Sequence, residues 1–198
     1  MIEFKYSAQG EGIIITLKTP VTEVGTLHKM VSVIYSLDWD IVSGDIKTIV
    51  EDGVSYSYDT FKIKKVLKKK FATPGELALL MESVFNSGSN LDEICRQIDS
   101  KKSKPRKFFK SKSELVFQDD IEKKVTIFYI EAENAKGLLF YLTKVLKDYR
   151  IDILEATIDT DLETKMARDT FYLRDSNGNL FGNLPIAEEI RIKILKDV

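Results

Sequence analysis

The sequence has one cysteine and one histidine among its 198 residues, and each scarcity excludes a class of protein. The single cysteine, Cys95, has no partner for an internal disulfide, which excludes a disulfide-stabilised scaffold. The single histidine, His28, excludes zinc sites with two histidine ligands and the multi-histidine centres of phosphohydrolases. We therefore expect no metal and no cofactor.

Long apolar runs are also missing. No stretch approaches the ~18 consecutive apolar residues that a membrane-spanning helix needs. The first residues, Met1-Ile2-Glu3-Phe4-Lys5, lack the apolar segment of a secretory signal. The composition, 43% hydrophobic and 31% charged, is that of an ordinary globular protein, so we expect a cytoplasmic protein that binds no membrane.

The net charge of −1 conceals a segregation of charge along the chain. Six lysines lie in Lys62–Lys70 and seven basic residues lie in Lys101–Lys112, and neither run contains an acidic residue. The remainder of the chain is acidic. We predict that the basic charge belongs to connecting segments.

An internal repeat at an offset of 112 residues organises the chain. An ordered series of matches with one short gap indicates a duplicated unit. We predict one domain over residues 1–100, a basic linker over 101–112 and a second domain over 113–198. The matching segments are Gly25-Thr26-Leu27 with Gly137-Leu138-Leu139, Asp40-Ile41-Val42 with Asp152-Ile153-Leu154, Ile46 with Ile158, and, after a two-residue gap, Asp59-Thr60-Phe61 with Asp169-Thr170-Phe171.

Each unit is predicted to contain a strand, a helix, a hairpin of two strands and a second helix. In the first unit, Thr73-Pro74-Gly75-Glu76 predicts a helix start, with an N-cap, a proline at the first helical position and a capping-box glutamate. Asn183 and Pro185 predict the corresponding start in the second unit. A fourth strand is expected from the N-terminal side of each unit, at Ile2–Tyr6 and at Leu115–Gln118.

The second unit, over Thr126–Leu180, resembles an ACT domain. The segments that carry this resemblance are Gly137-Leu138-Leu139, Asp152-Ile153-Leu154 and 169–178. Nearly the whole chain is similar to the tandem ACT pair of bifunctional uridylyltransferase/uridylyl-removing enzymes, including a basic linker at 104–109. The resemblance implies an α+β fold of two ferredoxin-like βαββαβ units, with antiparallel sheets, helices on one face, and the fourth strand supplied N-terminally.

The resemblance also implies a regulatory function. ACT domains pair side by side and commonly bind an amino acid where the loop after the first strand meets the partner unit. We therefore expect an amino-acid sensor that self-associates, either as a homodimer or within one chain, and that can act on a protein partner. We expect no enzyme activity, because Gly88-Ser89 is not followed by the paired aspartates of a nucleotidyltransferase and the histidines of a phosphohydrolase are missing.

The candidate binding loops are Thr22-Glu23-Val24-Gly25 and Asn134-Ala135-Lys136-Gly137. Backbone N–H groups at a helix N-terminus favour a carboxylate, and a glycine there lets the ligand approach the backbone. The Asn134 amide oxygen and the Thr22 hydroxyl can each accept a hydrogen bond from an ammonium group. The predicted ligand-binding residues are Thr22, Val24, Gly25, Thr26, Ile41, Val42, Asn134, Lys136, Gly137, Leu138, Ile153 and Leu154.

Two alternatives stay open at this point. In the first, both glycines only form tight turns and the protein is a ligand-free assembly or docking module. In the second, the basic runs and the nearby aromatic residues bind nucleic acid, although the chain lacks the aromatic-glycine signature of an RNA-binding sheet.

We expect His28 on the solvated, polar side of the first helix.

Overall fold

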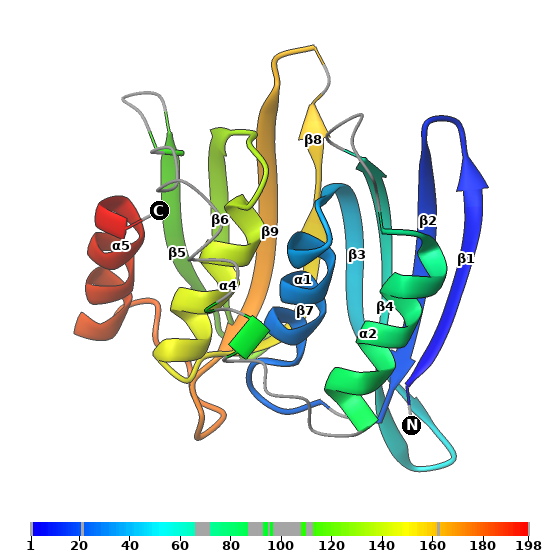
Figure 1. The fold of residues 1–198 in the computed structure, drawn as a ribbon. Helices are drawn as coiled ribbons and strands as arrows, with labels where there is room; N and C mark the ends of the chain where they lie inside the picture. The colour runs from blue at the N-terminus through cyan, green and yellow to red at the C-terminus, as the bar shows by residue number, and fades with distance from the viewer. Residues whose placement is uncertain are drawn as a thin grey trace.

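The computed structural model describes residues 2–20, 22–65, 72–86, 93–94, 96, 108–109, 113–161 and 163–197. These residues form one antiparallel sheet of nine strands with four long helices on one of its faces (Figure 1). Within the described ranges, no helix has the length and apolar character to cross a membrane. Cys95 and most of the predicted linker lie outside the described residues.

The chain contains the same order of elements twice. The first half contains β1 (Glu3–Gln9), β2 (Gly12–Thr19), α1 (Thr26–Ser36), β3 (Trp39–Glu51), β4 (Val54–Lys65) and α2 (Pro74–Asn86). The second half contains β5 (Glu114–Asp120), β6 (Val125–Glu133), α4 (Leu138–Asp148), β7 (Asp152–Ile158), β9 (Met166–Arg174) and α5 (Pro185–Asp197), with the two-residue strand β8 (Thr160–Asp161) added before β9.

The two halves share a single sheet, in the order β1-β2-β4-β3-β7-β9-β6-β5. Each N-terminal strand pairs within its own half, β1 with β2 and β5 with β6. Both N-terminal strands therefore lie where a fourth strand was predicted, at the two edges of the sheet. The predicted α+β class with helices on one face is confirmed, and each half has the order ββαββα.

Local sequence signals explain where the helices begin. At α2, the Thr73 backbone N–H donates to Glu76 Oε2 at 2.5 Å, and the Glu76 N–H donates to Thr73 Oγ1 at 3.2 Å. This is the reciprocal pattern of a capping box. The helix α5 begins at Pro185, as predicted, and buries Ile190 and Ile194 completely.

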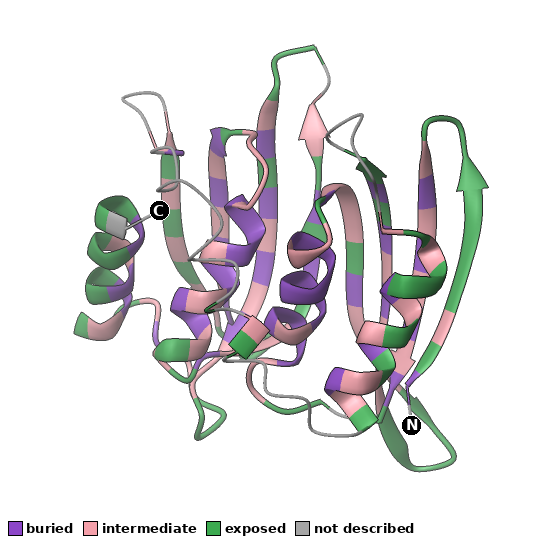
Figure 2. Cartoon of the chain, viewed as in Figure 1, coloured by how far each residue is buried: buried purple, intermediate pink, exposed green. Residues whose placement is uncertain are grey.

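Burial alternates along the strands because one sheet face is covered by helices and the other is not (Figure 2). On β4, Ser57, Asp59, Phe61 and Ile63 are buried under the helices, while the intervening residues are partly or fully exposed. The helices lie side by side in the order α2, α1, α4, α5, so α1 and α4 pack together over the middle of the sheet. A continuous apolar core runs between the two layers.

The contact between α1 and α4 corrects one expectation. His28 is buried, with 2% of its surface exposed, and is not on a solvated helix face. Its Nδ1 lies 3.1 Å from Thr143 Oγ1, and its ring lies 5.3 Å from that of Phe140. Because the Thr143 hydroxyl donates to the Leu139 carbonyl at 2.8 Å, its oxygen can accept the histidine N–H. Helical periodicity placed His28 on the polar side of an isolated helix, but α4 covers that side.

We predict that His28 makes the fold sensitive to acid. Burial, followed by the charges of Lys147 and Lys144, lowers its pKa to about 3. The unfolded chain therefore takes up a proton near pH 6.5 that the native chain does not, and stability falls as pH decreases through this window. Between pH 7 and pH 5, His28 should cost about 2 kcal/mol of stability. Urea unfolding of wild type and His28→Gln at both pH values measures this difference. An identical pH dependence in the two proteins would contradict it.

Candidate functional site

The central pairing of the sheet is short, and a pocket lies at each end of it. The strands β3 and β7 pair through four residue pairs, from Gly44 opposite Ile158 to Lys47 opposite Glu155. Beyond these pairs, residues of both strands line pockets together with the loop that precedes α1 or α4. Each pocket is therefore built from both halves of the chain.

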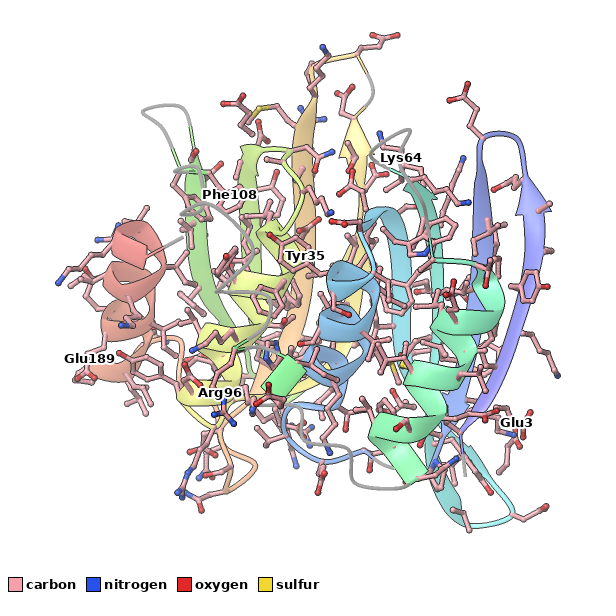
Figure 3. The ribbon with its side chains drawn as sticks, viewed as in Figure 1. Glu3, Tyr35, Lys64, Arg96, Phe108 and Glu189 are labelled. Carbon is pink, nitrogen blue, oxygen red and sulfur yellow. The ribbon has the colours of Figure 1, made fainter. Side chains whose placement is uncertain are left out.

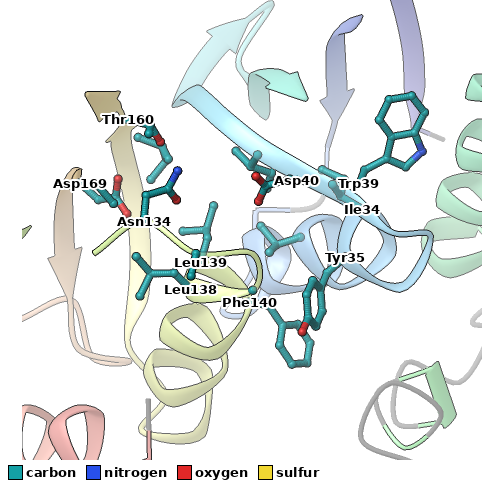
Figure 4. A pocket seen from close by; sticks show the side chains of 16 residues that line it. Ile34, Tyr35, Trp39, Asp40, Asn134, Leu138, Leu139, Phe140, Thr160 and Asp169 are labelled. Atoms are coloured by element: carbon teal, nitrogen blue, oxygen red, sulfur yellow. The ribbon is translucent and has the colours of Figure 1, made fainter. Parts of the chain in front are cut away.

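The larger pocket lies at the N-terminus of α4. Its cavity volume is about 30 Å³, and it is partly open to solvent. Asn134, Thr160 and Asp169 lie at one end, and Asp40, Ile34 and Trp39 lie at the other (Figure 4). The lining residues are Val31, Ile34, Tyr35, Trp39, Asp40 and Ile41 from the first half, and Asn134, Ala135, Gly137, Leu138, Leu139, Phe140, Ile158, Thr160, Ala167 and Asp169 from the second.

Gly137 holds the loop of this pocket in a conformation that favours glycine. Its φ is +98°, in the left-handed region, and it immediately precedes α4. A Cβ at this position would lie 2.9 Å from the Tyr35 ring. Tyr35 projects from α1 towards α4, where it stacks on Phe140 with ring centroids 4.9 Å apart (Figure 3). The Tyr35 ring of the first half therefore lies directly against the loop that precedes α4 in the second half.

Lys136 connects the two halves beside the pocket. Its ammonium group forms an ion pair with Asp38 and lies 5.4 Å from the centre of the Tyr35 ring. Lys136 is not among the residues that line the pocket. The lysine therefore holds the loop against the first half.

Asp40 is a partly buried carboxylate at the first-half end of the pocket. It lies opposite Lys64 in the register of β3 and β4. Burial raises the pKa of Asp40, while the charges of Lys64 and Lys136 act in the opposite direction. A carboxylate in this setting is stabilised further by any cation that enters the pocket.

Asp169 is the most deeply buried acid of the pocket, with 2% of its surface exposed. One of its oxygens accepts the backbone N–H of Asp159 at 3.3 Å. Burial raises the pKa of Asp169 to about 7, the Asp159 N–H lowers it, and the Asp159 charge raises it again. Among the described residues, no lysine or arginine forms an ion pair with this carboxyl group.

A second pocket, with a cavity volume of about 20 Å³, lies at the N-terminus of α1. All ten of its lining residues correspond, through the sequence repeat, to residues that line the larger pocket. Asp152 corresponds to Asp40 and lies opposite Arg174, as Asp40 lies opposite Lys64. The lining residues are Thr22, Glu23, Gly25, Thr26, Leu27, Ile46, Thr48, Ser57, Asp152 and Ile153.

The predicted binding residues fall into three groups, according to whether they line the larger pocket, the smaller pocket or neither. Ile41, Asn134, Gly137 and Leu138 line the larger pocket. Thr22, Gly25, Thr26 and Ile153 line the smaller one. Val24, Val42, Lys136 and Leu154 line neither pocket.

Val42 and Leu154 mark an irregularity that both halves share. The register of β3 with β4 skips Val42, and the register of β7 with β9 skips Leu154. A bulge bends a strand and redirects the residues beside it. The same bulge therefore accompanies Asp40 and Asp152, two residues that line the pockets.

The pocket-lining residues that sequence reasoning missed include Tyr35, Asp40, Thr160 and Asp169. Asp40 and Asp169 were visible as matched positions in the repeat, where an acid recurs within an apolar strand. Such a recurrence can indicate a functional site, because burying an ionised carboxyl group is costly unless another group compensates its charge. Tyr35 gave no such signal, since its counterpart in the repeat is Lys147.

The comparisons with known proteins leave the family open. No family model matches the chain. A solved structure described as an unknown protein from Galdieria sulphuraria is 12% identical, with a TM-score of 0.28 over 94% of this chain and 90% of that chain. In the described ranges, no group of three or more histidine, cysteine or acidic residues could hold a metal ion.

We predict that the two loop glycines differ in their tolerance of a side chain. At Gly137 an added Cβ meets the Tyr35 ring at 2.9 Å, whereas at Gly25 it meets the aliphatic chain of Lys147 at 3.2 Å. A flexible lysine can move aside, but a ring stacked on Phe140 cannot do so easily. Both substitutions carry a similar cost for the positive φ, of about 1 kcal/mol. Urea unfolding should therefore show a larger loss for Gly137→Ala than for Gly25→Ala, and equal losses would contradict the geometry.

We also predict that Asp169 destabilises the protein at neutral pH. Its folded pKa of about 7 lies above the ordinary value of 3.8, so the native state binds a proton that the unfolded state releases. The stability associated with Asp169 is present at low pH and is lost as pH rises through 7. Asp169→Asn should reduce the loss of stability between pH 5 and pH 8, measured by urea unfolding. A steeper loss in the variant than in wild type would contradict this sign.

Proposed function

We propose that this protein is a non-catalytic regulator that binds a free α-amino acid in the larger pocket, and that its two halves are a tandem pair of ACT-type units. The observation that carries the proposal is the meeting of Asp40, from the first half, with the N-terminus of α4, from the second half. Neither half alone supplies both groups.

The two groups are complementary to the two ends of an amino acid backbone. In the first turn of α4, the Leu138 N–H donates to the Ala135 carbonyl and the Tyr141 N–H donates to the Gly137 carbonyl. Leu139 and Phe140 lie between Leu138 and Tyr141 in the sequence, and their backbone N–H groups have no acceptor within the helix. They favour a carboxylate, while Asp40 of the first half favours an ammonium group.

The smaller pocket is proposed as a second site of the same kind. Its loop carries Gly25, with a φ of +91°, and Asp152 takes the place of Asp40. Three threonines and Ser57 make its walls more polar than those of the larger pocket. The two sites are therefore expected to differ in the side chains they accept.

Ligand binding in these pockets supplies a means of regulation, because each pocket is lined by residues of both halves. A ligand shifts a conformational equilibrium by the difference in its affinity for the two states. An amino acid held between the halves favours the state in which they are docked through β3, β7, α1 and α4. Pairing within one chain supports the intramolecular ACT pair over a homodimer as the basis of the site.

Two other functions receive less support. A ligand-free assembly module remains the alternative if no amino acid binds. For nucleic acid binding, Phe108 is buried against α4, with its ring centroid 6.1 Å from that of Tyr141, and is not available to stack on a base. Tyr56 already lies under the Lys18 ammonium group, at 4.5 Å. The basic runs themselves lie largely outside the described residues.

We predict that at least one common amino acid raises the thermal unfolding temperature, because binding to the native state stabilises it. Asp40→Asn should weaken that binding about tenfold or more, since it removes the charge opposite the ligand ammonium group. Titration calorimetry on both proteins measures the loss. Asp52→Asn, the same chemical change in the exposed β3–β4 turn, is the matched control and should bind as wild type does.

Two results would count against the proposal. If none of the amino acids changes the unfolding temperature, the protein is not a sensor of this kind. If an amino acid binds and Asp40→Asn leaves its affinity unchanged, the ligand occupies another site.

A further inference from the structure

The larger pocket has an unbalanced charge. Two carboxyl groups, Asp40 and Asp169, line it, and no lysine, arginine or histidine is among its lining residues. Asp40 receives the fields of Lys64 and Lys136, but Asp169 is influenced by no basic group among the described residues. The end of the pocket formed by Asn134, Thr160 and Asp169 therefore has acceptors and no cation.

The counterpart of Asp169 in the first half has a different set of hydrogen-bond donors. Burial raises the pKa of Asp59 to about 7 as well, and its Oδ1 has no hydrogen-bond partner among the described residues. In the first half, Asp59 is equally buried, and Ser57 donates its hydroxyl proton to Asp59 Oδ2 at 2.8 Å. The residue that corresponds to Ser57 in the second half is Ala167, which has no donor. Asp169 lines the pocket, whereas Asp59 does not line the smaller one.

Among the described residues, no group around Asp169 supplies a positive charge, because Asn134 and Thr160 at the same end of the pocket are neutral. On β6, Ile130 lies opposite Asp169 in the register, and the residues of α4 that line the same pocket, Leu138, Leu139 and Phe140, are apolar. The neighbouring Arg168 pairs instead with Glu131 and Asp161. Asp159 contributes its backbone N–H, but its own charge is negative. A cation in the pocket would be the missing partner of the Asp169 carboxylate.

We propose that the ligand of the larger pocket is an amino acid with a second cationic group at the end of its side chain, a diamino acid such as lysine or ornithine, and that Asp169 is the residue that selects it. This inference rests on the proposed function. The α-ammonium group meets Asp40, the α-carboxylate meets the first turn of α4, and the side-chain ammonium group meets Asp169. The apolar residues between the two carboxyl groups contact the methylene chain.

The test compares lysine with norleucine, which has a side chain of similar length without the terminal amine. Titration calorimetry of wild type should give at least about tenfold tighter binding for lysine, the range expected for a charge-assisted hydrogen bond. In Asp169→Asn the ratio of the two affinities should fall to about one. Asp59→Asn, the same change at the counterpart position outside the pocket, is the control and should keep the wild-type ratio.

Proton release gives an independent readout. A cation beside Asp169 favours its ionised form, so lysine binding at pH 7 should release roughly half a proton, given a pKa of about 7 before binding. Titrations in two buffers of different ionisation enthalpy count this proton. Norleucine should release none, and neither ligand should release one from Asp169→Asn.

The outcomes separate the two proposals. If no amino acid binds, the proposed function fails and this inference fails with it. If norleucine binds as tightly as lysine, or if lysine releases no proton, the pocket binds amino acids but Asp169 does not select a cationic side chain. In that case the proposed function stands and the inference is overturned.

Discussion

The pairing of β3 with β7 is the constraint on which the rest of the structure depends. It joins two similar halves through four residue pairs, and one of these, Asp45 opposite Thr157, joins residues that correspond to each other in the repeat. The pairs on either side of it are related by exchange: Gly44, opposite Ile158, corresponds to Ala156, and Ile46, opposite Ala156, corresponds to Ile158. The junction therefore has an approximate twofold symmetry, and because the pairing is short, it leaves one pocket at each end.

The symmetry of the backbone is not repeated in the chemistry of the side chains. Three backbone and sequence features recur in both halves: a glycine with positive φ, a bulge, and an aspartate near the start of β3 (Asp40) or of β7 (Asp152). The groups that face the pockets differ: Tyr35 corresponds to Lys147, and Ser57 corresponds to Ala167. Duplication of a unit supplies two similar pockets, and substitutions at a few lining positions then change the chemistry of each. The larger, more apolar pocket with its unbalanced carboxyl groups is the outcome at α4.

The sequence was sufficient to predict the helices and strands, but not the contacts between the two halves of the chain. The capping box at Thr73 and the glycines that precede two of the helices are local signals, and each lies where it was predicted. The burial of His28 and the position of Tyr35 over Gly137 depend on α4 packing against α1. Neither follows from the periodicity of α1 alone. Eight of the twelve predicted binding residues line a pocket. Asp40 and Asp169 also line one but were not predicted, because each was considered only as part of its own strand, without the other half of the chain that completes the pocket.

The central claim is that one ligand is held by both halves at once, and the most direct test is an amide-resolved NMR titration with the amino acid that most raises the unfolding temperature. The account predicts that the amides of Asp40 and Ile41 shift together with those of Gly137 to Phe140, with one common dissociation constant. Shifts confined to one half, or shifts centred on the uncovered sheet face around Tyr58 and Tyr172, would contradict a shared pocket.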